Sequence, residues 1–141
     1  MGQEKITLCV IDTNVVISAI LFGGGPGKLI DLWKKGQITP LITEEIMAEY
    51  IRVLAYPKFK LSEEEINYII RQEILPFFKV VKSKPGPSII KKDPDDDKFI
   101  QCAEVGNAQI IISGDRHLLA LKSHHGIKIL TPSQILDELL L

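Results

Sequence analysis

The chain of 141 residues carries 17 lysines and arginines against 18 aspartates and glutamates, a formal net charge of −1. Its hydrophobic content of 45% and charged content of 25% are ordinary for a globular domain and exclude a disordered chain. The charge balance also excludes attraction to nucleic acid by a global positive field. Binding to RNA or DNA would therefore require local basic patches or bound cations.

The ends and the cysteines bear on the cellular compartment. The N-terminal residues lack the apolar core of a signal peptide, and no apolar run approaches the ~18 residues of a membrane helix. Cys9 and Cys102 lie in apolar segments and have neither the spacing of a disulfide framework nor that of a metal site. We therefore expect a cytoplasmic protein without membrane contact, with buried free thiols and a single domain over residues 1–141.

Short apolar runs alternate with helical segments along the whole chain. The runs predicted as strands are residues 5–11, 38–42, 77–81, 108–113 and 127–130. The segments predicted as helices are residues 14–22, 28–36, 43–55, 62–75, 97–106, a stretch from 114 onward, and 131–141. This alternation predicts a three-layer α/β/α sandwich with a mainly parallel sheet.

Helix-breaking and helix-capping residues between these segments support the predicted boundaries. A glycine-rich GGGPG stretch ends the first helix, and Thr43 has the character of a helix N-cap. Ser62 and Glu65 stand in the S-x-x-E spacing of a capping box.

Two aspartates stand directly after predicted buried strands. Asp12 follows the first strand, and Asp115 follows the strand at 108–113. Because ligands of open parallel sheets bind beyond the carboxyl ends of the strands, both side chains are well placed for a metal or a substrate. The competing interpretation makes each aspartate a helix N-cap, although two caps at one sheet edge would still converge.

Glu49 is a third candidate, on the predicted helix 43–55. It flanks the apolar stripe of that helix, where a carboxylate costs desolvation energy unless it is paired or bound to a cation. The alternative is a surface carboxylate that reaches outward to solvent.

The sequence DPDDD, residues 93–97, supplies further carboxylates at Asp93, Asp95, Asp96 and Asp97. Its spacing partly matches a calcium-binding EF-hand loop. However, Lys98 occupies the position where the sharp turn of that loop demands glycine.

A cluster of carboxylates without histidine or cysteine favours hard divalent cations. Mg²⁺ and Mn²⁺ prefer carboxylate oxygens and retain several waters. Such ions can activate a water molecule and stabilise the leaving oxygen of a phosphodiester. They would also offset the repulsion between the carboxylates and a phosphate backbone.

Four segments, in this order, resemble the motifs of PIN-domain (PilT N-terminus) nucleases: VIDTNVVISAIL, TEEIMAEYIRVL, DPDDDKFIQCA and IIISGDRHLL. The resemblance implies that catalytic, metal-holding acidic residues lie at Asp12, Glu49, Asp97 and Asp115. Relatives often read DPDDNK, with Asn where this chain has Asp97, so Asp96 is the alternative ligand. Asn14 and Ser113 resemble polar residues that orient the acidic cluster.

The resemblance also implies a fold and an activity. The family has a five-stranded parallel sheet between helices, and its common activity is Mg²⁺- or Mn²⁺-dependent cleavage of single-stranded RNA. Lys98 and Arg116 are candidate RNA contacts, and His117 is expected to be a surface or substrate-contact residue. This short form is similar to VapC-like toxins of toxin–antitoxin pairs, which are often homodimers inhibited by a small antitoxin protein.

Three other functions compete with the nuclease. An inactive PIN fold would serve as an RNA-binding or scaffold module. A haloacid-dehalogenase-type phosphatase would need a second acid where Asn14 stands. A receiver domain phosphorylated on aspartate would share the size and the acidic sheet edge.

Overall fold

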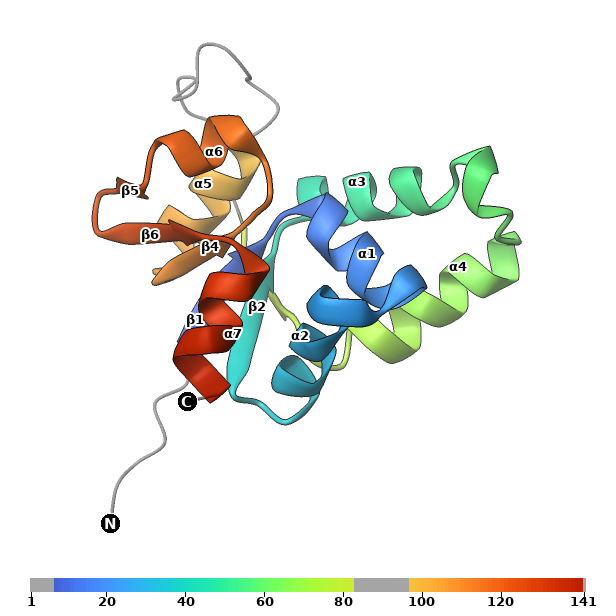
Figure 1. Ribbon diagram of the computed structural model, residues 1–141. Coiled ribbons are helices and arrows are strands. Elements are labelled where there is room, and N and C mark those ends of the chain that lie inside the picture. Colours follow the sequence, from blue (N-terminus) through green and yellow to red (C-terminus); the bar gives the residue numbers. More distant parts are fainter. Residues whose placement is uncertain (1–6, 83–96, 141) are drawn as a thin grey trace.

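The computed structural model describes residues 7–82 and 97–140 of the chain. These residues form an α/β/α sandwich, with α2 and α7 on one face of the central sheet and α5 on the other (Figure 1). The described strands are β1 (Thr7–Ile11), β2 (Ile38–Ile42), β3 (Lys79–Val80), β4 (Ile110–Ile112), β5 (Ser123–His124) and β6 (Ile127–Leu130). The helices are α1 (Thr13–Phe22), α2 (Gly24–Lys34), α3 (Glu44–Leu54), η1 (Pro57–Phe59), α4 (Glu63–Ile69), η2 (Ile70–Ile74), α5 (Asp97–Val105), α6 (Arg116–Ala120) and α7 (Pro132–Leu140).

The sheet runs in the order β3-β2-β1-β4-β6-β5. All neighbouring strands are parallel except β5, which pairs antiparallel with β6. The predicted three-layer fold with a mainly parallel sheet is therefore confirmed. The sixth strand, β5, was not predicted from the sequence.

The topology reverses direction between β1 and β4. From β1 the chain builds β2 and β3 on one side of the sheet, whereas β4 and β6 are added on the other side. The last residues of the two strands lie in register, with Ile11 paired to Ile112. A crevice is expected beyond the carboxyl ends of two strands at such a switch point, and it is a common position for ligands.

Most of the glycine-rich segment that was predicted to separate the first two helices belongs to α2. α1 ends at Phe22, and Gly23 has a φ of 69°, a backbone conformation that glycine adopts without steric cost. α2 already begins at Gly24, before the predicted start at residue 28. Pro26 is accommodated there because a proline in the first turn of a helix removes no intrahelical hydrogen bond.

Other local predictions are confirmed. The Ser62 hydroxyl accepts a hydrogen bond from Glu65 N at 3.0 Å, and the Glu65 carboxylate accepts one from Ser62 N at 2.9 Å, which completes the capping box. Cys9 and Cys102 are buried free thiols. Burial raises the pKa of the Cys102 thiol to about 12, so it stays protonated at neutral pH.

The apolar core lies on both sides of the sheet. Its largest fully buried side chains include Trp33, Tyr50 and Phe99. In the described ranges, no single helix is long and apolar enough to cross a membrane; α1 and α2 reach that length only together, across a bend of 98°.

Candidate acidic site at the carboxyl edge of the sheet

Asp12 and Asp115 lie at the switch point, each at the start of a helix. Asp12 caps α1, and its carboxylate accepts a hydrogen bond from Asn14 N at 3.4 Å. Asp115 caps α6, and its Oδ1 accepts hydrogen bonds from His117 N at 2.8 Å and Leu118 N at 3.3 Å. Each aspartate is therefore a helix N-cap, and the two aspartates also line the same cleft.

Ser113 connects the two aspartates. Its hydroxyl donates a hydrogen bond to Asp12 Oδ2 at 2.7 Å and accepts one from the backbone N–H of Asp115 at 2.9 Å. The Ser113 side chain is fully buried. A change in the position of either aspartate would break one of these bonds, so Ser113 fixes their relative placement.

Glu49 reaches the same region from α3. Its Oε2 accepts a hydrogen bond from Thr13 Oγ1, one residue after Asp12. Its Oε1 lies 2.9 Å from Lys98 Nζ and 3.4 Å from a guanidinium nitrogen of Arg52. Glu49 is therefore held toward the site by α1 and α5 and does not extend into solvent.

The charge of Asp12 is costly where it stands. Only 5% of the residue is exposed, and its hydrogen-bond donors are a hydroxyl and a backbone amide, not cations. Burial raises the pKa of the Asp12 carboxyl, and the negative charges of Asp115 and Glu49 raise it further, against the opposing effect of the bonds from Ser113 and Asn14. A bound cation would stabilise the carboxylate form.

A cleft of about 440 Å³ opens at the two aspartates. Its lining consists of Asp12, Asn14, Val15, Ser18, Pro26, Gly114, Asp115 and Arg116. The Arg116 side chain thus supplies a positive charge at a cleft that is otherwise acidic.

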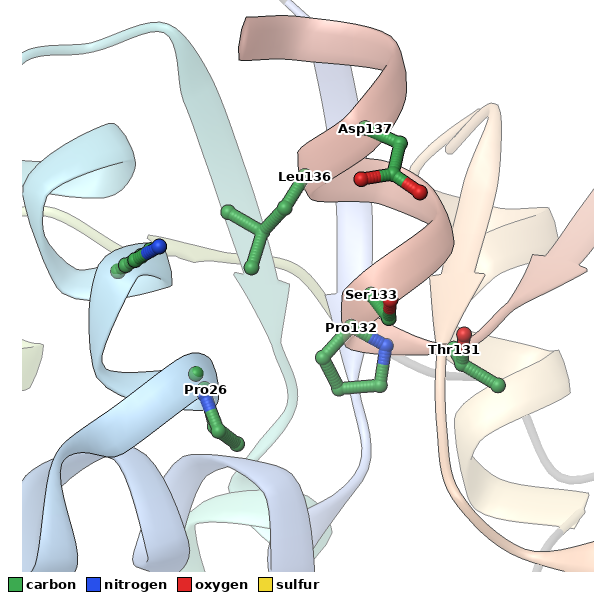
Figure 2. A pocket seen from close by; sticks show the side chains of 8 residues that line it. Pro26, Thr131, Pro132, Ser133, Leu136 and Asp137 are labelled. Carbon is green, nitrogen blue, oxygen red and sulfur yellow. The ribbon is translucent and has the colours of Figure 1, made fainter.

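A second hollow lies beside this cleft and shares Pro26 with it. Figure 2 shows Pro26 on α2 facing Pro132 and Leu136 on α7 across the hollow. Its lining contains one lysine, Lys28, and one aspartate, Asp137, so charge does not mark it as a phosphate site.

The structure places the residues predicted from the sequence as follows. Asp12, Asp115 and Ser113 are in direct or bridged contact, and Glu49 joins them through Thr13. The Asn14 side chain and Arg116 line the cleft. Asp96 and the Asp97 side chain lie outside the described residues, so the choice between them as ligand stays a prediction.

The structure also shows the surroundings of Lys98 and His117, which the sequence named as candidate substrate contacts. Lys98, a candidate RNA contact from the sequence, is only 7% exposed, and its ammonium faces Glu49; its contact with RNA stays a prediction. His117 is exposed, with Nδ1 3.7 Å from Asp115 Oδ1. Thr13 was missed as a site residue, although its place directly after Asp12 in the DTN sequence was a usable signal.

A family profile described as PIN domain matches residues 9–117, which is most of the chain and contains Asp12, Glu49 and Asp115. The chain belongs to the PIN-domain family. A search of curated proteins found no match.

Two solved structures share the fold of this PIN domain. PAE2754 from Pyrobaculum aerophilum is 17% identical in sequence, with a TM-score of 0.59, over 96% of this chain and 90% of its own. FitAcB from Neisseria gonorrhoeae is 16% identical, with a TM-score of 0.59, over 89% of this chain and 98% of its own. At these identities the likeness concerns the fold alone.

The donor set of this PIN domain fits a hard divalent cation. Asp12 and Asp115 offer carboxylate oxygens at one cleft, and in the part of the chain that the structure describes, the hydrogen bonds to the buried Asp12 carboxylate come from Ser113 and Asn14 and from no cation. Glu49 is compensated by Lys98 and Arg52. Within residues 7–82 and 97–140, the oxygens of Asp12, Glu49 and Asp115 do not all lie within 4.8 Å of one another.

Proposed function

We propose that this PIN domain is a cytoplasmic, Mg²⁺- or Mn²⁺-dependent endoribonuclease that hydrolyses phosphodiester bonds of single-stranded RNA. The observation that carries the proposal is the joint placement of Asp12 and Asp115 in one cleft, bridged by Ser113, at the switch point of the sheet. Two unpaired buried thiols agree with a reducing compartment.

The position of each residue in the cleft suggests a separate role for it in catalysis. Asp12, Asp115 and Glu49, with Asp97 or Asp96, would hold the metal. A bound divalent ion supplies a water of lowered pKa and neutralises developing charge on the phosphate. Ser113 keeps Oδ2 of Asp12 in one orientation through its hydrogen bond. Arg116, at the edge of the cleft, is placed to contact a backbone phosphate.

Lys98 receives a different role in this proposal from that of an RNA contact. Its buried ammonium pairs with Glu49, so it positions that carboxylate and limits the repulsion among the acidic groups when no metal is bound. An interaction of Lys98 with RNA would require its removal from Glu49.

The activity is tested with purified protein and single-stranded RNA in the presence of Mn²⁺. We expect cleavage by the wild type and a loss of at least about 100-fold in Asp12→Asn and Asp115→Asn, because each removes one charge that holds the ion. Asp31→Asn, which changes an exposed aspartate on α2, serves as the matched control and should keep full activity.

Two results would contradict the proposed nuclease activity of the acidic site. RNA affinity that is insensitive to EDTA, without cleavage by the wild type, would identify an inactive RNA-binding module. Equal cleavage by the wild type and the aspartate variants would show that the acidic site is not the source of the activity.

We further propose that the protein is a homodimer and the toxin of a toxin–antitoxin pair. An apolar groove between α1, α3 and η1 supports a protein contact. It is lined in part by Phe22, which is 71% exposed, together with Tyr56 and Phe59. Light scattering should give the mass of a dimer for the wild type and of a monomer for Phe22→Glu.

The toxin assignment is tested by expression in cells. Growth arrest on expression, relieved by a small protein encoded beside it, would support the assignment; the absence of arrest by an active nuclease would contradict it.

A further inference from the structure

A second cluster of titratable side chains lies at the opposite end of the sheet from the acidic site. Glu104 comes from the last part of α5, and His124 and His125 belong to the hairpin that joins β5 to β6. His124 Nε2 lies 2.8 Å from Glu104 Oε1, and His125 Nδ1 lies 3.4 Å from the same oxygen. One ligand atom from each residue falls within 4.8 Å of the other two.

The turn of the hairpin brings the two imidazoles to the same side. Successive residues of a strand point to opposite faces of the sheet. However, His125 and Gly126 have φ values of 49° and 83° in a two-residue connection between paired His124 and Ile127. Positive φ at both positions is the hallmark of a type I′ turn. As a result the two rings lie side by side, with centroids 4.0 Å apart and planes tilted by 34°.

This ligand set differs in kind from the acidic site. Two imidazoles and one carboxylate suit borderline ions such as Zn²⁺, whereas Mg²⁺ and Mn²⁺ prefer oxygen ligands. In a tetrahedral zinc site with bonds of about 2.1 Å, ligand atoms lie about 3.4 Å apart. The separations of 2.8 and 3.4 Å around Glu104 are close to that value, and the ligand atoms of the two histidines lie within 4.8 Å of each other.

We propose that Glu104, His124 and His125 form a Zn²⁺ site with water completing the coordination. The ion would replace the hydrogen bond that Glu104 now shares with His124, which is the more covered of the two histidines, with 17% of its side chain exposed. It would clamp the end of α5 to the β5–β6 hairpin. Because Lys98 stands in the first turn of the same helix, this clamp also stabilises the element that reaches Glu49.

The site is tested by calorimetric titration of ZnCl₂ into metal-free protein without a histidine tag at pH 7.5. We expect a Zn²⁺ binding event that excess Mg²⁺, which would occupy the acidic site, does not displace, and His124→Ala, His125→Ala and Glu104→Gln should each weaken it by about 100-fold. Even loss of a group that only orients a metal ligand costs about 10–100-fold. Zn²⁺ should also raise the melting temperature of the wild type and not that of His124→Ala.

The chain provides its own controls, since its three histidines are His117, His124 and His125. His117→Ala and Asp12→Asn should both keep the Zn²⁺ affinity of the wild type. In NMR spectra, Zn²⁺ should shift the ring signals of His124 and His125 ahead of those of His117, which reports on the site without any substitution. Unchanged Zn²⁺ affinity in the hairpin variants, or its loss in Asp12→Asn, would overturn the proposal.

Discussion

The ammonium of Lys98 lies 2.9 Å from the carboxylate of Glu49, and Lys98 is only 7% exposed. The pair joins the first turn of α5 to α3 beside two further carboxylates, Asp12 and Asp115. Burial, and after it the negative charges of Asp115 and Glu49, already raise the pKa of the Asp12 carboxyl. A buried lysine that faces this group therefore performs part of the charge compensation that a metal would provide.

Replacing Lys98 by methionine should separate the two sources of compensation. In metal-free Lys98→Met, we expect the free energy of unfolding to fall by up to about 3 kcal/mol, because the largely buried Glu49 carboxylate keeps only its longer ionic contact with Arg52. Addition of Mn²⁺ should raise the melting temperature of this variant more than that of the wild type, since the ion no longer competes with the ammonium for Glu49. Thermal denaturation with and without Mn²⁺ measures both effects.

Lys35→Met is the control for Lys98→Met, because Lys35 is an exposed residue at the end of α2. It should leave both the stability and the Mn²⁺ response unchanged. An equal response of Lys98→Met and the wild type to Mn²⁺ would show that Lys98 and the metal do not share Glu49.

The raised pKa of Asp12 predicts a specific pH dependence of stability. The folded protein holds the Asp12 proton at higher pH than the unfolded chain does, so the free energy of unfolding falls as pH rises from the ordinary aspartate pKa through the raised one. Above that window the destabilisation is fully present. Asp12→Asn removes it and keeps an oxygen that can accept from Ser113, so this variant should be more stable than the metal-free wild type at pH 7.

Urea denaturation between pH 3.5 and 7 measures this difference. The stability of Asp12→Asn relative to the wild type should grow with pH and level off above the raised pKa. Saturating Mn²⁺ should reverse the order at pH 7, because the ion stabilises only the wild type carboxylate. Asp31→Asn should show no such trend, and a pH-independent difference for Asp12→Asn would contradict the burial argument.

The hydroxyl of Tyr50 supports the same strand end. It donates a hydrogen bond to the backbone oxygen of Ile11 at 2.7 Å, and Tyr50 is fully buried. Burial, followed by the charge of Asp12, raises the pKa of Tyr50, so the hydroxyl keeps its proton. Tyr50→Phe should therefore lower the free energy of unfolding by about 1–2 kcal/mol through an unsatisfied buried carbonyl. Tyr68→Phe, at a side chain that is 64% exposed, should have no effect in the same urea titration; equal stability of both variants and the wild type would refute the role of this bond.

The sequence contained the main elements of this architecture but not the contacts between them. The apolar runs predicted β1, β2, β3, β4 and β6, and the position of Asp12 and Asp115 directly after strands placed both at the carboxyl edge. The sequence left Glu49 undecided between the site and solvent, because the answer depends on Thr13 and Lys98, which come from two other elements. β5 was missed because two residues carry no alternation, and its turn depends on an uncommon positive φ at His125.

The close packing of Gly106 against β2 gives a last test of the fold around α5. A β-carbon added at Gly106 would collide with Cδ1 of Leu41, a fully buried side chain, and would lie 3.3 Å from the backbone oxygen of Cys102. Gly106→Ala should therefore lower the free energy of unfolding by about 1–3 kcal/mol, the usual cost of overpacking. Gly25→Ala should cost nothing comparable, because nothing lies within 4 Å of its added carbon.

A double-mutant cycle of Gly106→Ala with Leu41→Ala tests whether the collision with Leu41 is the cause of the cost. Leu41→Ala alone should cost about 2–5 kcal/mol, and Gly106→Ala should cost at least about 1 kcal/mol less in that background than in the wild type. Additive costs would show that Leu41 yields without strain and that Gly106 is not required for this contact.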